Sequence, residues 1–250
     1  MIKFALLASG SKGNCCLIKN CETSIVIDCG STKKYLSTCF ERLKFDYHSI
    51  SALFVTHTHT DHISQLKMFE GIDTYALANL DIDSFYKVEP YDEITLDTLR
   101  VKVIPTSHDA KDSCGYVVES SDQKLVYITD TGYINEAIKP YLMNADYYIF
   151  ESNHDIEMLM ATKRPMFVKQ RIIGDFGHLC NEDSANVLAE LVGKKTKEIV
   201  LAHISEEGNS KERAKAVLLD TLQAKQIDTS RLRIISAPQF EIVRGGNNSK

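Results

Sequence analysis

Short apolar runs alternate with segments of helical periodicity along this chain, and together they predict an α/β fold. Apolar and β-branched runs that are bounded by polar turns are typical of buried strands. Strands are expected at 2–7, 16–19, 24–27, 52–56, 74–76, 100–104, 115–119, 124–129, 147–150, 198–201, 232–235 and 241–243. The polar residues 121–123, between two of these runs, predict a hairpin.

Apolar side chains recur at helical spacing between many of these strands. In segment 33–43 they include Tyr35, Leu36, Cys39 and Phe40, with Ser31 as the candidate N-cap. Other helices are expected at 63–69, 135–142, 182–191 and 211–226. Because both halves of the chain contain strands and helices, we expect two sheets packed face to face with helices outside. No linker precedes the polar tail 245–250, so a single domain over 1–250 is predicted.

Composition narrows the class of protein. Of 250 residues, 44% are apolar and 25% are charged, which matches the globular average and excludes a disordered chain. No apolar run is long enough to span a bilayer, so no membrane association is expected. The seven cysteines include no C-x-x-C pair, which argues against a disulfide framework or a thiolate zinc site and favours the cytoplasm. The net charge of −5 excludes a broadly basic surface.

Three of the eight histidines lie within a single segment, 55–62. His57 and His59 are two positions apart in extended backbone, so both imidazoles can face one metal ion just past a strand end. Asp61 and His62 begin a helix and can serve a second ion nearby, as in two-metal sites. The alternative is a polar loop with solvated histidines, but chance produces this pattern in only about one such chain in a thousand.

This motif, after a strand in an α/β chain, resembles the metallo-β-lactamase superfamily, whose fold is an αββα sandwich of two mixed β-sheets. Four other segments fit the resemblance: 25–30, 106–108, 126–132 and 199–203. It implies that one ion is held by His57, His59 and His108, and a second by Asp61, His62 and His203. It also implies that Asp130 bridges the ions and that Asp28 supports the ligands from behind.

Three finer segments, 8–14, 150–155 and 169–182, resemble the YycJ/WalJ (VicX) branch of that superfamily. The branch is regarded as nuclease-like, with 5′ to 3′ exonuclease activity on DNA assigned to members, and is similar to ribonuclease Z. The resemblance implies that Glu151 orients His178, which protonates the departing alkoxide. The alternative is that both residues only cap and anchor their elements.

Substrate contacts are expected on the core surface, because the chain has no room for an inserted clamp domain or a tRNA-gripping arm. The basic candidates are Lys163, Arg164, Lys169 and Arg171. Further candidates for substrate contacts, with polar side chains, are Ser11, Asn14, Asn153 and His154. The loop that contains Ser11 and Asn14 also offers backbone N–H groups to an anionic oxygen. The alternative for the basic cluster is a solvated face.

The hypothesis is a dinuclear metal-dependent phosphodiesterase in which a hydroxide between the ions attacks phosphorus, and Asp61 and Asp130 orient it. Two divalent ions are expected, Zn²⁺ or Mn²⁺, with Fe²⁺ also admitted by the donor set. The substrate is a nucleic acid, with DNA favoured over RNA. A small-molecule hydrolase acting on a cyclic phosphodiester, lactone or thioester stays open, as does a non-catalytic nucleic-acid-binding protein. The oligomeric state is not predicted.

Overall fold

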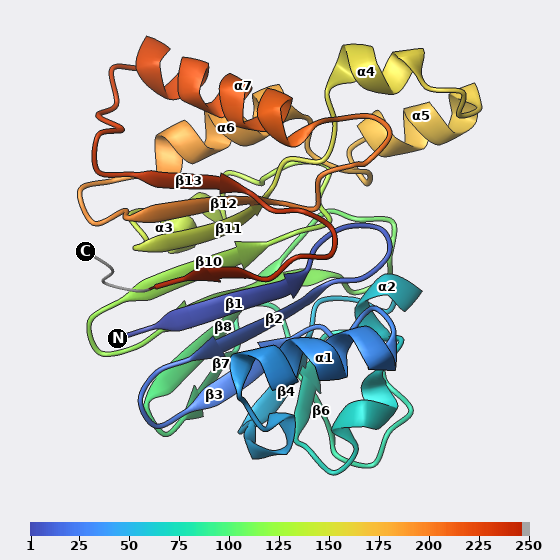
Figure 1. Ribbon diagram of the computed structural model, residues 1–250, viewed down its shortest axis with the longest axis vertical. Helices are drawn as coiled ribbons and strands as arrows, with labels where there is room; N and C mark the ends of the chain where they lie inside the picture. The colour runs from blue at the N-terminus through green and yellow to red at the C-terminus, as the bar shows by residue number, and fades with distance from the viewer. Residues whose placement is uncertain (247–250) are drawn as a thin grey trace.

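Two seven-stranded mixed sheets form the centre of the computed structural model, which describes residues 1–246 (Figure 1). In spatial order, the first sheet consists of β14 (Val243–Gly245), β1 (Lys3–Ala8), β2 (Cys15–Lys19), β3 (Ser24–Ile27), β4 (Ala52–Val55), β5 (Thr74–Ala76) and β6 (Phe85–Lys87). The second consists of β13 (Arg233–Ser236), β12 (Glu198–Ala202), β11 (Tyr147–Glu151), β10 (Lys124–Ile128), β9 (Cys114–Glu119), β8 (Leu99–Pro105) and β7 (Glu93–Leu96). β14 returns from the end of the chain to pair with β1.

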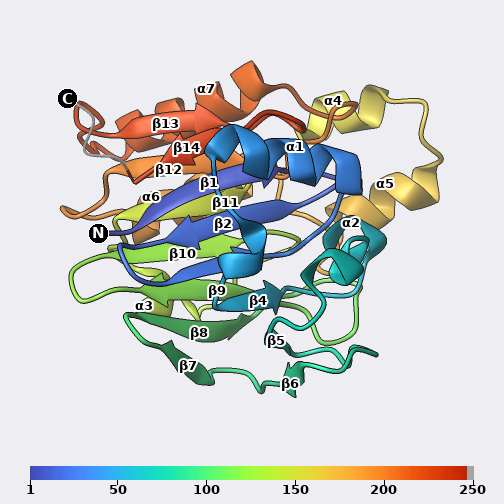
Figure 2. The ribbon, with the colours of Figure 1, turned by 60° about the horizontal axis from the view of Figure 1, so that its bottom comes forward.

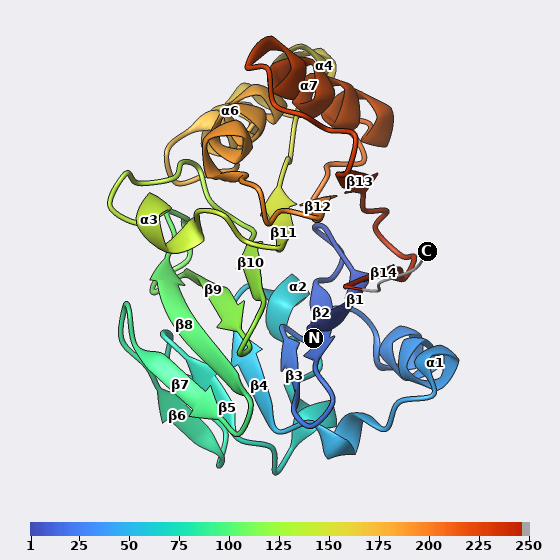
Figure 3. The same cartoon turned by 90° about the vertical axis from the view of Figure 1, so that its left-hand side faces the viewer.

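Helices cover the outer faces of both sheets, which confirms the predicted αββα sandwich (Figure 3). α1 (Lys33–Leu43) packs on the first sheet, and α6 (Asn181–Leu191) and α7 (Lys211–Ala224) pack on the second. The shorter helices are α2 (Thr60–Ile63), α3 (Lys139–Leu142), α4 (Ile156–Ala161) and α5 (Met166–Ile173), with 3₁₀ turns at Tyr47–Ser49 and Leu66–Phe69. Within residues 1–246, none of the helices has the length and apolar character that crossing a membrane requires.

The strands are apolar on both faces because each sheet lies between two layers. In β3, Ile25 and Ile27 join the core between the sheets, whereas Val26 joins the core under α1. In β10, Tyr127 faces the other sheet and Val126 faces the helices. This alternation explains why the sequence shows continuous apolar runs rather than an apolar–polar pattern.

Several predicted boundaries were wrong for local reasons. Thr32, not Ser31, caps α1, because the Thr32 side chain accepts a hydrogen bond from Tyr35 N. The helix predicted at 135–142 shrinks to α3, where Pro140 lies in the first turn, the place where its missing N–H is tolerated. The helix predicted at 63–69 divides into α2 and a 3₁₀ turn. The predicted polar tail, 245–250, overlaps β14, which ends at Gly245. Residues 247–250 of that tail lie outside the described residues.

Parallel pairing brings the functional segments to one edge of the sandwich. β3 and β4 are parallel to each other, as are β10, β11 and β12, so within each sheet the carboxyl ends of these strands share an edge. Figures 1 and 2 show α2, α4 and α5 at one end of the sandwich. The loops that follow the strands at this end contain most of the candidate site residues.

Candidate metal centre

The histidine motif folds as its spacing predicts. β4 ends at Val55, and α2 begins at Thr60 with His59 as its N-cap. His57, His59 and His108 each offer a ring nitrogen, and these atoms lie within 4.8 Å of one another. His57 and His108 are buried, whereas His59 is half-buried at the surface. This group could hold one metal ion.

A second group forms beside the first from Asp61, His62 and His203, whose donor atoms also lie within 4.8 Å of one another. Asp130 lies between the two groups. Its Oδ2 is 3.3 Å from His62 Nε2, and its Oδ1 is 3.5 Å from His203 Nε2 and 3.8 Å from His108 Nε2. Asp130 is therefore positioned to touch ions in both groups.

Several buried imidazole nitrogens in the two groups have no hydrogen-bond partner, as expected of atoms that bind metal ions. The Nε2 atoms of His57, His108 and His203 are buried and have no hydrogen-bond partner. Buried polar atoms are rarely left unpaired in native proteins, and imidazole nitrogens with carboxylate oxygens are the donors that zinc, manganese and iron accept. The residues present therefore fit two divalent cations.

In four of the five histidines of the two groups, Nδ1 is held from behind. His57 Nδ1 lies 3.1 Å from Thr56 Oγ1, and His108 Nδ1 donates to Gly177 O at 3.1 Å. His62 Nδ1 lies 2.8 Å from Asp28 Oδ2, and His203 Nδ1 lies 3.0 Å from Glu151 Oε1. Such contacts fix the tautomer and direct Nε2 toward the centre.

The carboxylates make this centre attractive to positive charge. Burial lowers the pKa of His203, but the attraction of Asp130 and Glu151 outweighs burial and raises it to about 9. Burial likewise lowers the pKa of His62, yet Asp28 and Asp130 together raise it well above its usual value. A metal ion that replaces the protons on His62 and His203 would be attracted by the same negative carboxylates.

Three of these residues adopt the left-handed backbone conformation at a strand end. Asp28, Asp130 and His203 follow β3, β10 and β12 with φ of 59°, 55° and 54°. Asp, Asn and His are the non-glycine residues most often found there. The turn redirects the chain after each strand. Near Asp28, Gly30 allows close approach, since a Cβ at that position would overlap Asp61 O.

Glu151 and His178 form a pair next to the two groups. Glu151 Oε1 accepts from His178 Nδ1 at 2.8 Å, and its Oε2 accepts from Thr131 N at 2.9 Å. Burial raises the pKa of Glu151, but the charges and hydrogen bonds of His178 and His203 lower it to about 2. An ionised Glu151 therefore orients His178, which stays partly exposed at 17%.

The remaining polar candidates have different positions. Asn14 Nδ2 lies 2.9 Å from His62 Nε2 and 3.2 Å from Asp61 Oδ2, so Asn14 lies at the second group. Asn153 Nδ2 donates to His203 O at 2.8 Å and supports that loop. His154 is buried with both ring nitrogens unpaired, and burial lowers its pKa to about 4. Ser11 is exposed.

The four basic candidates have different surroundings, and only Lys169 is buried. Lys169 is buried, and its Nζ donates to Met160 O at 2.6 Å and to Thr162 O at 2.8 Å. Arg164 pairs with Glu207, and Arg171 pairs with Asp109. Lys163 is exposed. Lys169 thus ties α4 to α5 and is not available to a phosphate.

We therefore expect Lys169→Ala to destabilise the protein by about 2 kcal/mol, because two carbonyls lose a charged donor. Urea denaturation measures this change, with Lys163→Ala as the exposed control that should stay within about 0.5 kcal/mol of wild type. A Lys169 variant of full stability whose DNA affinity depends less on salt would instead support the phosphate-contact role.

Sequence reasoning missed Asp109. Its Oδ1 lies 3.4 Å from His108 Nε2 and 3.8 Å from His59 Nε2, while Arg171 pairs with the same carboxylate. The only signal in the sequence is its position directly after His108. Ser9 was also missed, although its Oγ accepts from His203 N at 2.8 Å.

Comparison with known proteins agrees with this geometry. A family model described as a β-lactamase superfamily domain matches residues 23–204. The chain is similar to exodeoxyribonuclease YycJ of Bacillus anthracis, with 33% identity over 238 residues that cover 90% of each chain. It is also similar to exodeoxyribonuclease WalJ of Streptococcus pneumoniae, with 31% identity over 236 residues and 88% of each chain.

Solved structures share the architecture over nearly the whole chain. The metallo-β-lactamase fold protein YhfI from Bacillus subtilis has a TM-score of 0.68 at 17% identity, covering 98% of this chain and 99% of its own. The short form of human tRNase Z has a TM-score of 0.64 at 15% identity, covering 96% and 98%. At such low identity the likeness bears on the fold alone.

Proposed function

The chain belongs to the metallo-β-lactamase superfamily, and on that premise we propose that it is a dinuclear metal-dependent nuclease, a 5′ to 3′ exonuclease acting on DNA. The observation that carries the proposal is Asp130 lying between two histidine groups, with the Glu151–His178 pair beside them. The similarity to two proteins named exodeoxyribonucleases supports DNA as the substrate. A cytoplasmic location remains a prediction from composition.

The two groups would bind one divalent ion each, through the ligand sets that the family resemblance implies, with Asp130 shared. When bound, such ions lower the pKa of water and neutralise charge on the phosphate oxygens. Asp61 and Asp130 then accept hydrogen bonds from the attacking water and orient it toward phosphorus. His57, His62, His108 and His203 stay fixed because Thr56, Asp28, Gly177 and Glu151 hold their Nδ1 atoms.

His178 supplies the proton that the leaving group needs. The alkoxide of a phosphodiester is a poor leaving group, so its departure requires a nearby general acid. The ionised Glu151 accepts from His178 Nδ1 and fixes the ring. His178 is partly exposed, so its ring remains accessible to substrate.

The test combines metal analysis with substrate comparison. Protein reconstituted with zinc or manganese should contain about two ions per chain by elemental analysis. It should release nucleotides from the 5′ end of labelled single- or double-stranded DNA faster than from RNA. A metal content of one or below would contradict the dinuclear site. Activity only on a cyclic dinucleotide or a thioester would favour the small-molecule alternative.

A further inference from the structure

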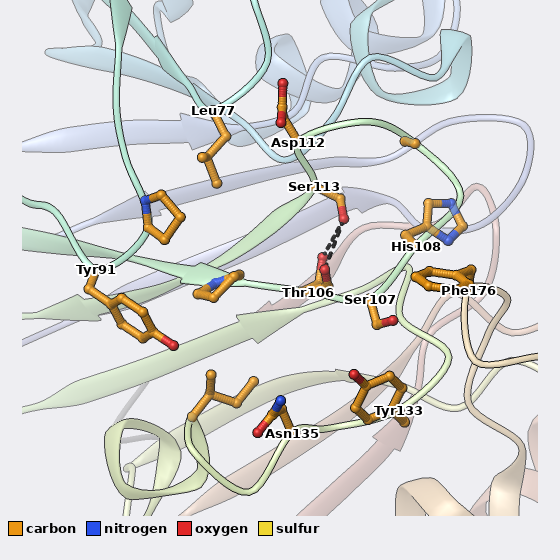
Figure 4. Close-up of a pocket in the computed structure, with 14 residues that line it drawn as sticks. Leu77, Tyr91, Thr106, Ser107, His108, Asp112, Ser113, Tyr133, Asn135 and Phe176 are labelled. Carbon is orange, nitrogen blue, oxygen red and sulfur yellow. Dashed lines mark hydrogen bonds between the residues drawn. The ribbon is translucent and has the colours of Figure 1, made fainter.

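A pocket of about 440 Å³ opens beside His108 (Figure 4). It falls at the small end of the range for ligand sites, which suits a group of about the size of one nucleoside. His108 forms part of its wall and also belongs to the first histidine group. A ligand in the pocket would therefore lie directly next to the proposed metal centre.

Three aromatic side chains from separate loops line this pocket. Phe176 lies next to His108, Tyr91 lies at the opposite end, and Tyr133 lies along one wall (Figure 4). Each is open to solvent, with exposed fractions of 64%, 41% and 44% respectively. Exposed aromatic rings that converge on a pocket are stacking surfaces for planar groups, and nucleobases are the planar groups of the proposed substrate.

The charge of the lining selects a neutral group rather than a phosphate. None of the residues that line the pocket, all of them in the described part of the chain, is Lys or Arg. Asp112, exposed, adds a negative charge. A phosphate would be repelled from this pocket toward the histidine groups, whereas a base and its sugar would not.

Backbone contacts hold the aromatic loops in place. Ser107 Oγ donates to Asp175 O at 2.8 Å, and Gly132 N donates to Ser107 O at 2.8 Å. A Cβ on Gly132 would overlap Asp175 O, so the two loops touch at a glycine. Tyr133 and Phe176 are the residues that directly follow these contacts. The backbone that carries Tyr133 and Phe176 is therefore held before ligand binds, which lowers the entropic cost of binding.

From these observations we propose that the pocket binds the nucleoside attached to the scissile phosphate, with its base stacked on Phe176 and flanked by Tyr133. This proposal rests on the proposed phosphodiesterase function. It assigns a binding role to residues that lie outside both histidine groups and outside the Glu151–His178 pair. It also gives a nucleotide a place next to the reacting centre that does not depend on Lys169, which is buried.

The first test compares three p-nitrophenyl phosphodiesters: the thymidine 5′ ester, the thymidine 3′ ester and the methyl ester. Wild type should prefer at least one thymidine ester over the methyl ester by roughly five- to a hundredfold in kcat/KM, the scale of one base–aromatic stack. Phe176→Ala and Tyr133→Ala should bring this ratio toward one, whereas Phe176→Trp should keep it. Phe167→Ala, which removes a 72% exposed phenylalanine outside the pocket, should also keep it.

The second test measures binding without turnover. With calcium present, 2-aminopurine deoxyriboside 5′-monophosphate should lose fluorescence on binding to wild type and to Phe167→Ala, but not to Phe176→Ala. Equal hydrolysis of all three esters by wild type would overturn the pocket while leaving the phosphodiesterase intact. If no ester is hydrolysed, the proposed function fails, and the fluorescence titration alone decides whether the pocket binds a nucleoside.

Discussion

Replacing His178 with alanine should slow DNA hydrolysis by on the order of a hundredfold to ten-thousandfold, the range of general acid catalysis, while both metal ions stay bound. The reason is that His178 is held by Glu151 through a 2.8 Å contact and belongs to neither of the two histidine groups assigned to the ions. The loss should shrink on a p-nitrophenyl phosphodiester, because that leaving group departs without a proton. Steady-state rates on the two substrates and elemental analysis check this.

The matched control is His48→Ala, since His48 is exposed and outside the site. It should change neither rate nor metal content. An equal loss on both substrates would contradict the general acid role. Loss of one ion from His178→Ala would instead make His178 a ligand, because Asp130, Glu151, His178 and His203 also place donor atoms within 4.8 Å of one another.

Much of the centre could be predicted from the sequence because its residues follow strands. The family resemblance implied Asp28, His108, Asp130 and His203, and the strand pattern agrees with it because each of them follows the end of a predicted strand. Parallel pairing then brings those ends together. His57 and His59 could be paired from the sequence alone, because side chains two residues apart in an extended segment point to the same side.

Lys169 is the opposite case, because its burial could not be predicted from the sequence. A lysine in a sequence reads as surface charge, but Lys169 is buried by the packing of α4 on α5. Those two helices were themselves missed, because their apolar residues are not all turned inward: Phe167 is 72% exposed and Met166 is 53% exposed. Burial of this kind depends on tertiary contacts that no local pattern encodes.

Two of the four edge strands, β6 and β7, show the same limit. β6 and β7 were not predicted, because they lie at the margins of their sheets and are only partly buried. An edge strand has one neighbour, so its side chains need not be strongly apolar. The nucleoside pocket that we propose could not be foreseen either, since its aromatic residues come from loops far apart in the chain.

Replacing Asp130 with asparagine should have the second large effect: metal content should fall from about two ions to one or fewer, and activity should fall on the order of a thousandfold. Asparagine keeps the shape of the side chain but removes its charge and one of its acceptor oxygens. Burial raises the pKa of Asp130, yet the charges of His203 and His62 lower it far more, so this carboxylate is ionised at neutral pH. Elemental analysis and a DNA cleavage assay measure both changes.

The Asp28→Asn variant distinguishes the loss of a residue that orients a metal ligand from the loss of Asp130, which lies between the two groups. Asp28 contacts His62 Nδ1 at 2.8 Å and accepts from Thr56 N at 2.8 Å, but it belongs to none of the groups of donor atoms that could hold an ion. Loss of the Asp28 carboxylate should weaken metal affinity by about 10- to 100-fold, the usual effect of removing a group that orients a ligand. Excess metal should therefore restore the activity of Asp28→Asn. Excess metal should not restore Asp130→Asn, because the charged carboxylate that lies between the two groups is gone. If both variants recover equally at high metal concentration, Asp130 only supports its neighbours and the two ions do not share it.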